Sequence, residues 1–397
     1  MSVRLFIARR LSYRSPVVTA AIAVSFLVVI IAIAVSGGFR NEIRDGLSEM
    51  SGDVLLSASD INYLDESSSV HTHQSYMTGI KNMDGVASVR PVIYRAGIVK
   101  HSENIYGVMV KGVEADASDA GGTYVPDSTS LAVSIPSSLA EISGLKPGDR
   151  MLTYFVGDKV KVRQFNVVDM YEPLVRTDDR YLVYADIEDI RRLNGWTEEQ
   201  TSMFEVLLED DYREGDALLR ATEEISDHIY YNASPDDDML MAASSADRFP
   251  QVFEWLTLID FNVMFVLVLM IAVAGVNMIT GLLIMLFENI STIGLFKSLG
   301  MRNVEIVNVF LTRASITVLK GMLVGNVLAL AFCLLQDSTH LIQLDPANYF
   351  VSYVPVHIDF THVLCADALA FVVIMLLMLL PSLFVLRVDP ARTVKMD

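Results

Sequence analysis

The chain has 397 residues, a formal net charge of −18 and a mean hydropathy of +0.41, with 52% apolar residues. Soluble proteins of this length seldom contain four apolar stretches as long as those of this chain, so the composition excludes an ordinary soluble protein. The acidic balance argues against nucleic-acid binding, which needs basic surfaces.

Four apolar runs organise the chain, at residues 17–36, 259–287, 309–336 and 363–387. Each is long enough to cross a bilayer, which takes ~20 apolar residues. About 220 mostly polar residues, 37–258, separate the first run from the second. We therefore expect a membrane protein with four transmembrane α-helices and a large domain inserted between helices 1 and 2.

Basic residues set the expected orientation of these helices. Three basic segments fall on the same side if each run spans once, at Arg4, Arg9, Arg10 and Arg14, at Lys297, Arg302 and Arg313, and at Arg387, Arg392 and Lys395. The positive-inside rule makes that side cytoplasmic, so both termini are expected inside. The inserted domain, with 39 acidic and 19 basic residues, is then outside. The first run is longer than a signal-peptide core, so we expect it to be retained.

The remaining segments follow from local patterns. Residues 1–16 read as an amphipathic elbow helix on the inner face. Residues 37–258 mix strand-like alternation, as in Val86–Lys100, with helical segments, so an α+β domain with stalk helices is expected. Gly37 and Gly38 offer a place for the first helix to bend, and Ala246–Ile259 reads as a stalk. Residues 288–308 form a cytoplasmic loop, 337–362 an outer loop and 388–397 a cytoplasmic tail.

Motifs of enzymes and metal sites are missing from the sequence. It contains no GxxxxGK[ST], HExxH, GxSxG or CxxC pattern, so we expect no catalytic residues, no cofactor and no metal. His71-Thr72-His73 and Asp236–Asp238 read as solvated loops rather than ligand sets.

The cytoplasmic loop carries the strongest functional pattern. Its residues suggest an amphipathic helix that begins near Glu288, where a negative charge suits the helix dipole, and ends at a glycine cap. Such a helix fits a groove in a partner protein, with the lipid surface as the alternative. The residues assigned to this element are Glu288, Ile293, Leu295, Phe296, Lys297, Leu299 and Gly300.

The same loop carries a family resemblance. The stretch NMITGLLIMLFENISTIGLFKSLGMRNVEIVNVF resembles the coupling-helix region of FtsX/MacB-type ABC transporter permeases, and is most similar to that of the LolC/LolE lipoprotein-releasing permeases. RLFIARR, SGGFRNEI, IPSSLAEISGLKPGDRMLTYF, FNVVDMYEPLVRTDDRYLVYADIEDIRRLNGW, LDPANYFVSYVPVHID and LLPSLFVLRVDPARTVKMD resemble further family segments in the family's order.

This resemblance implies a multi-pass protein of the bacterial inner membrane with a periplasmic domain. It implies two separate ATPase subunits, a second permease copy or paralogue, lipoprotein cargo and a periplasmic lipoprotein carrier as partners. Glu288–Gly300 would dock on the ATPase, and the first two helices would flank the lipoprotein. The candidate cleft residues on those helices are Ile22, Phe26, Ile30, Val263, Leu267 and Met270.

One segment departs from the family's pattern. The carrier-binding member has an extended hook between its two periplasmic motifs, whereas Gly157–Lys159 form a minimal turn here. Direct carrier contact is therefore left open, and a LolE-like role is favoured over a LolC-like one. Two other functions stay open, a MacB-like exporter of small molecules or peptides and an FtsX-like activator of a cell-wall hydrolase.

Overall fold

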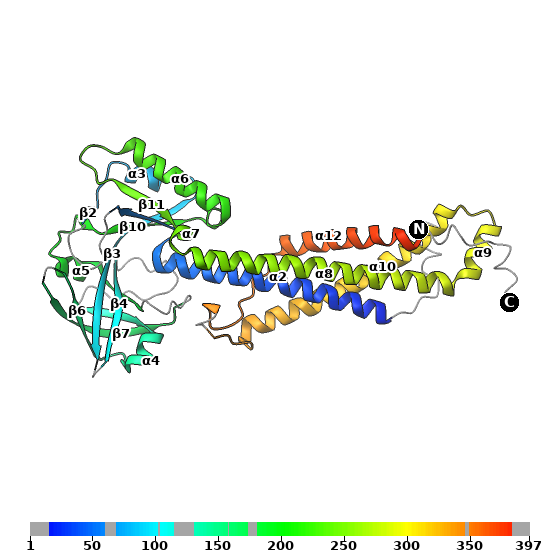
Figure 1. Ribbon diagram of the computed structural model, residues 1–397, viewed down its shortest axis with the longest axis horizontal. Helices are drawn as coiled ribbons and strands as arrows, with labels where there is room; N and C mark the ends of the chain where they lie inside the picture. The colour runs from blue at the N-terminus through cyan, green and yellow to red at the C-terminus, as the bar shows by residue number, and fades with distance from the viewer. Residues whose placement is uncertain are drawn as a thin grey trace. The chain divides into compact units, whose positions relative to one another are not determined.

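The computed structural model describes residues 16–59, 69–101, 104–114, 131–157, 159–173, 181–345 and 349–382. The chain divides into two compact units (Figure 1). A helical unit comprises residues 1–40, 255–343 and 353–397, and an extramembrane domain comprises residues 41–254 and 344–352. The predicted elbow helix, apart from Pro16, and the predicted tail at 388–397 lie outside the described residues.

Four helices among the described residues are long and apolar enough to cross a membrane. They are α2 (Pro16–Ser51), α8 (Pro250–Glu288), α10 (Asn303–Thr339) and the pair α12 (Phe360–Leu377) and α13 (Leu379–Ser382). A mixed domain of strands and helices lies between α2 and α8 in the chain. The predicted fold class, four such helices with an α+β domain between the first two, is confirmed.

The four helices share one apolar core. Its buried members come from every helix and include Phe26 of α2, Ala274 of α8, Phe310 of α10 and Ile374 of α12. Glycines allow α10 to approach α2 closely, since a Cβ added at Gly325 would lie 2.5 Å from the Ala23 carbonyl oxygen. The Gly-xxx-Gly spacing at 321 and 325 therefore packs helices within this chain.

The helix does not end at Gly37 and Gly38, where a bend was expected, and α2 continues as one helix to Ser51. The segment after α10 instead packs against these glycines, and the His357 amide donates to the Ala34 carbonyl at 2.9 Å. A Cβ added at Gly38 would lie 2.4 Å from the Pro355 carbonyl oxygen, whereas one at Gly37 would meet nothing nearer than 3.5 Å. Gly38 serves close backbone approach rather than flexibility.

These distances give a matched pair of variants. Gly38→Ala is expected to destabilise the protein by about 1–3 kcal/mol, because two backbones must separate to admit the methyl group. Gly37→Ala is expected to be near neutral or slightly stabilising, since alanine favours helix. Thermal unfolding of both variants in detergent checks this, and equal melting temperatures would refute the close-approach role.

The domain is built on a nine-stranded sheet with the order β11-β1-β10-β3-β4-β8-β5-β7-β6. Strand β3 also pairs with β6, which closes the last six strands of that order into a ring. The strands are β1 (Val54–Ala58), β3 (Val86–His101), β4 (Asn104–Val113), β5 (Ala132–Pro136), β6 (Arg150–Phe155), β7 (Lys161–Tyr171), β8 (Tyr181–Asp186), β10 (Met203–Leu208) and β11 (Leu240–Ser244). A separate small ladder joins β2 (Val70–His71) to β9 (Gln200–Thr201).

Helices pack on this sheet and complete two of its hydrophobic cores. The short helices are α3 (Met77–Lys81), α4 (Ser137–Ser143), α5 (Ile187–Asn194), α6 (Gly215–Asn232), α7 (Ser245–Arg248) and the 3₁₀ turn η2 (Asp210–Tyr212). One core joins the strand ring to α4 and α5, and the other joins β1, β10 and β11 to α3 and α6. The 16-residue strand β3 contributes to both cores.

Candidate functional site

The predicted coupling element contains a short helix, α9 (Ile290–Ser298), between α8 and α10. Glu288, which was expected to begin this helix, is instead the last residue of α8, so it does not complement the N-terminal dipole of α9. The element ends at a glycine cap, as predicted: Gly300 has a φ of +85°. The Gly300 amide donates to the Lys297 carbonyl and the Met301 amide to the Phe296 carbonyl, both at 3.0 Å. This is the Schellman arrangement, which satisfies the last carbonyls of the helix and fixes the turn into α10.

The apolar residues of this element divide between two faces. Ile293 is buried in the helical core, and Phe296 packs against that core. Leu295 and Leu299 are 53% and 76% exposed, and Phe287 at the end of α8 is 54% exposed. Glu288 and Gly300 are also exposed, while Lys297 is half-buried. The surface open to a partner is therefore Phe287, Glu288, Leu295 and Leu299, a smaller set than the sequence pattern suggested.

Two of the six candidate cleft residues meet at one small gap. Phe26 of α2 and Met270 of α8 line it together with Ser25, Val29, Ile271, Ala274, Ala370 and Ile374. The space holds scarcely one water molecule, so an acyl chain would enter only if the helices moved apart. The seam of α2 and α8 around this gap is hereafter the α2/α8 seam.

The other four candidates have different surroundings. Ile22 packs against α10, because a Cβ added at Gly321 would come within 2.7 Å of its Cγ2 atom. Ile30 is fully buried with Ala329 of α10 and Val363 of α12. Val263 and Leu267 are half-buried on α8, and Leu267 packs against the helical core.

Polar residues that the sequence analysis missed join α2 and α8 near the point where the apolar run of α2 ends and that of α8 begins. The Ser36 hydroxyl donates to Asp260 Oδ1 at 2.8 Å, and Arg40 forms an ion pair with the other carboxylate oxygen of Asp260. Phe39 and Trp255 stack edge to face beside them, with ring centroids 5.5 Å apart. The only sequence signal was that charges sit just beyond the apolar runs on both helices.

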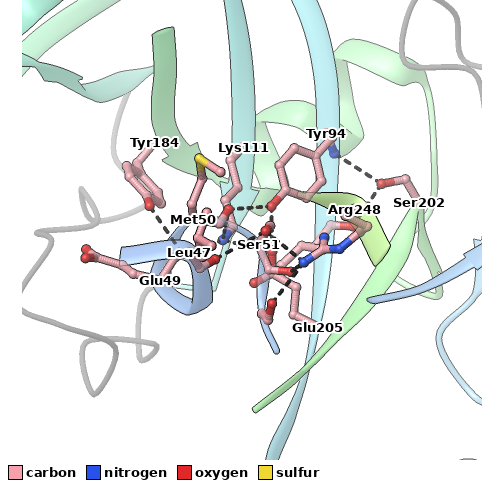
Figure 2. A network of polar contacts seen from close by, with 12 residues as sticks. Leu47, Glu49, Met50, Ser51, Tyr94, Lys111, Tyr184, Ser202, Glu205 and Arg248 are labelled. Atoms are coloured by element: carbon pink, nitrogen blue, oxygen red, sulfur yellow. Dashed lines mark hydrogen bonds and ion pairs between the residues drawn. The ribbon is translucent and has the colours of Figure 1, made fainter. Parts of the chain in front are cut away.

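A second polar cluster lies within the domain and holds the last turn of α2 (Figure 2). Lys111 Nζ forms an ion pair with Glu205 at 2.9 Å and donates to the Glu49 and Met50 carbonyls at 3.1 Å each. The Tyr94 hydroxyl contacts the Met50 carbonyl at 2.7 Å and Glu205 at 2.5 Å. A cation suits a helix C-terminus, where carbonyls are unpaired. We refer to these residues as the α2 clamp.

Arg248 extends the α2 clamp from the other side. Its Nη2 atom donates to the Ser51 and Gly52 carbonyls and to the Ser51 hydroxyl, each at 2.9 Å. Lys111 and Glu205 are only 3% and 5% exposed, so this ion pair is almost dry. Burial lowers the pKa of Lys111, and the Glu205 carboxylate opposes that shift. The clamp therefore ties the end of α2 to strands β3, β4 and β10 through charge-assisted contacts.

Glu49, on the last turn of α2, has a perturbed acidity. Burial raises its pKa from 4.5 to about 7, and Lys111 opposes this shift. Because the pKa is higher in the folded state than in the unfolded state, folding takes up a proton at pH values between about 4.5 and 7. The contribution of Glu49 to the free energy of unfolding is therefore full below pH 4.5 and is lost as the pH rises through 7.

Glu49→Gln is therefore expected to make unfolding less sensitive to pH between 5 and 8. At pH 8 the variant should be more stable than the parent by about 1–2 kcal/mol, a figure reduced from the full shift because the side chain is partly solvated. The free energies of unfolding of the parent and of the variant, each measured at pH 5.5 and at pH 8, check this expectation. Parallel pH profiles would show that another group is responsible.

The histidine and aspartate motifs form loop contacts with each other. His71 Nδ1 lies 3.0 Å from Asp238 Oδ2, and the Gln74 amide donates to the same oxygen at 2.9 Å. Among the residues that the structure describes, no three His, Cys, Asp or Glu side chains gather as metal ligands would. Cys333 is buried, Cys365 is exposed, and both are free.

The link between β6 and β7 is short. Phe155 pairs with Lys161, so residues 156–160 join the two strands, of which Asp158 lies outside the described residues. This agrees with the minimal turn predicted at Gly157–Lys159.

Comparisons with known proteins bear on the whole chain. Residues 264–390 match the family described as FtsX-like permease C-terminal. The lipoprotein-releasing system transmembrane protein LolC of Neisseria meningitidis serogroup B is 22% identical over 418 residues, covering 98% of this chain and 95% of that protein. LolC of Xylella fastidiosa strain 9a5c is 22% identical over 406 residues, covering 95% and 92%. The periplasmic region of MacB from Actinobacillus actinomycetemcomitans has 15% identity and a TM-score of 0.31, covering 52% of this chain and 95% of that structure.

Proposed function

We propose that this chain is a LolC/LolE-type permease of the FtsX/MacB family, the membrane subunit of a transporter that extracts lipoproteins from the inner membrane. The observation that carries the proposal is similarity along 95–98% of the chain to proteins named for lipoprotein release. A match of that extent includes the extramembrane domain as well as the permease helices. The chain is then a multi-pass inner-membrane protein with both termini in the cytoplasm and residues 37–258 in the periplasm.

Energy for the reaction comes from a separate ATPase. The sequence has no phosphate-binding GxxxxGK[ST] motif, so this chain supplies the coupling surface and not the hydrolysis. We assign docking to Phe287, Glu288, Leu295 and Leu299, because these side chains are exposed on one connection between α8 and α10. Ile293 and Phe296 instead pack α9 against the helical core, so that a displacement of α9 is transmitted directly to the long helices.

Acyl chains are taken up along the α2/α8 seam. Phe26 and Met270 already line one apolar gap there, which would have to widen to admit a chain. An acyl chain gains ~0.8 kcal/mol for each CH₂ that it buries. The lipid bilayer already gives an acyl chain most of that gain. The seam therefore holds cargo only while the transport cycle keeps α2 and α8 apart.

The α2 clamp gives α2 a second role. A helix whose last turn is bound by Lys111 of β4, Tyr94 of β3 and Arg248 of α7 moves together with those elements. Motion started at α9 would thereby reach the extramembrane domain as a rigid-body displacement. The short β6–β7 turn leaves carrier contact by a hook to the second permease subunit, a paralogue or an identical copy.

Reconstitution tests this function. The chain is co-expressed with its ATPase and second permease, placed in vesicles with a triacylated lipoprotein, and given ATP with a soluble apolar acceptor. We expect ATP-dependent transfer of the lipoprotein to the acceptor and none for the same protein lacking its acyl chains. Drug efflux without lipoprotein transfer would favour a MacB-like exporter, and activation of a cell-wall hydrolase alone would favour FtsX-like signalling.

A further inference from the structure

Both carboxylate oxygens of Asp260 on α8 are bound by side chains of α2. The Ser36 hydroxyl donates to Oδ1 at 2.8 Å, and the Arg40 guanidinium pairs with Oδ2. Ser36 is buried at 7% exposure, so parting the two helices leaves it and one carboxylate oxygen without these partners. The three residues therefore oppose separation of the α2/α8 seam.

Their position along the helices is informative. The apolar run of α2 ends at Ser36, and Asp260 stands at the start of the apolar run of α8, which continues from Phe261 to Phe287 without another charge. On α2, residues 26, 29, 33, 36 and 40 recur at steps of three and four, as do residues 260, 263, 267, 270 and 274 on α8. Such spacing lines one face of a helix, so the polar cluster and the gap at Phe26 and Met270 belong to one seam.

The strength of the contact suits a reversible closure. The side chains of Arg40 and Asp260 are 39% and 40% exposed, so water can replace each partner when the pair breaks. A fully buried pair would hold the helices together far more firmly. Phe39 of α2 and Trp255 of α8 add an edge-to-face aromatic contact between the same two helices.

We propose that Ser36, Arg40 and Asp260 form a latch that holds α2 and α8 together at the outer end of the seam, and that this latch must release before an acyl chain enters. The proposal rests on the proposed function and adds the residues that control access. It makes Ser36, Arg40 and Asp260 positioning residues, since they bind each other and not the cargo.

A covalent lock tests whether the seam opens here. Ser36→Cys and Asp260→Cys are combined in a chain whose native thiols are removed by Cys333→Ala and Cys365→Ala. The reconstituted complex is oxidised, cross-linking is measured, and lipoprotein release is followed before and after reduction. We expect at least a tenfold loss of release on cross-linking and recovery on reduction, with both single-cysteine chains unaffected by oxidant.

Charge reversal tests the ion pair without a covalent bond. Arg40→Asp and Asp260→Arg each place like charges together, and we expect several-fold faster cargo-independent ATP hydrolysis in each. The double variant restores an opposite pair, and we expect its basal hydrolysis to return to within about twofold of the parent. If basal ATP hydrolysis in the double variant is instead raised by the combined factor of the two single variants, the latch is wrong.

The outcomes separate the latch from the function on which it rests. If the parent complex releases no lipoprotein, the proposed function fails whatever the lock does. If the parent releases lipoprotein and the fully cross-linked complex releases it equally well, the function stands and the latch is wrong.

Discussion

Replacing Leu295 and Leu299 together with serine is expected to reduce cargo-stimulated ATP hydrolysis at least tenfold. Both side chains are more than half exposed, and they lie one helical turn apart at the end of α9. Removing them from a protein interface forfeits about 2–4 kcal/mol of apolar contact. Because neither belongs to the helical core, the variant should fold normally. The measurement is ATP turnover by the reconstituted complex at increasing ATPase subunit concentration, where a docking defect shifts the midpoint.

Leu341→Ser is the matched control, since Leu341 is 68% exposed just beyond the opposite end of α10. It removes an equally exposed leucine and should leave turnover unchanged. Glu288→Lys provides a second variant on the same surface and should also weaken docking, through a reversed charge. Parent-like turnover in the double serine variant would mean that α9 rests on lipid.

Lys111→Met is expected to destabilise the extramembrane domain by about 3–5 kcal/mol. The change leaves the Glu205 carboxylate buried without its cation and removes a donor from the Glu49 and Met50 carbonyls. The chain has two tryptophans, so Trp255→Phe leaves Trp196 as a reporter inside the domain. Denaturant unfolding followed by Trp196 fluorescence in the full chain measures the loss.

Lys100→Met, on the same strand ladder but exposed, is the control and should change stability by less than about 0.5 kcal/mol. Adding Glu205→Gln to Lys111→Met should recover part of the loss, because it removes the stranded charge. If the double variant is less stable than Lys111→Met, the clamp is not held by this ion pair.

Strong periodic patterns made much of the domain predictable from sequence. Alternation at Val86–Lys100 predicted β3 to within one residue of its observed end at His101. Strand β5, Ala132–Pro136, is buried at every position and so has no alternation to detect. Strand β11 was missed because Leu240–Ser244 is short and mostly small or flexible residues.

Tertiary contacts explain what the sequence left undetermined. Gly37 and Gly38 suggested a bend, yet the close approach of Pro355 is what Gly38 allows. The apolar residues of the loop at 288–300 were expected on one face, and packing of Ile293 into the core divides them. The latch joins residues 220 and 224 positions apart, and the contacts of the α2 clamp span 44 to 197 positions, so no local pattern encodes these pairings.

The most direct test of the account is acyl-chain contact at the α2/α8 seam. A photo-crosslinking residue replaces Met270, which faces the gap, or Phe265, which is 62% exposed on another face of α8. In turning-over complexes, we expect triacylated lipoprotein to crosslink at position 270, not at 265, and the crosslink to vanish for cargo without acyl chains. Equal crosslinking at both positions, or none at 270 in a complex that releases lipoprotein, would contradict the account.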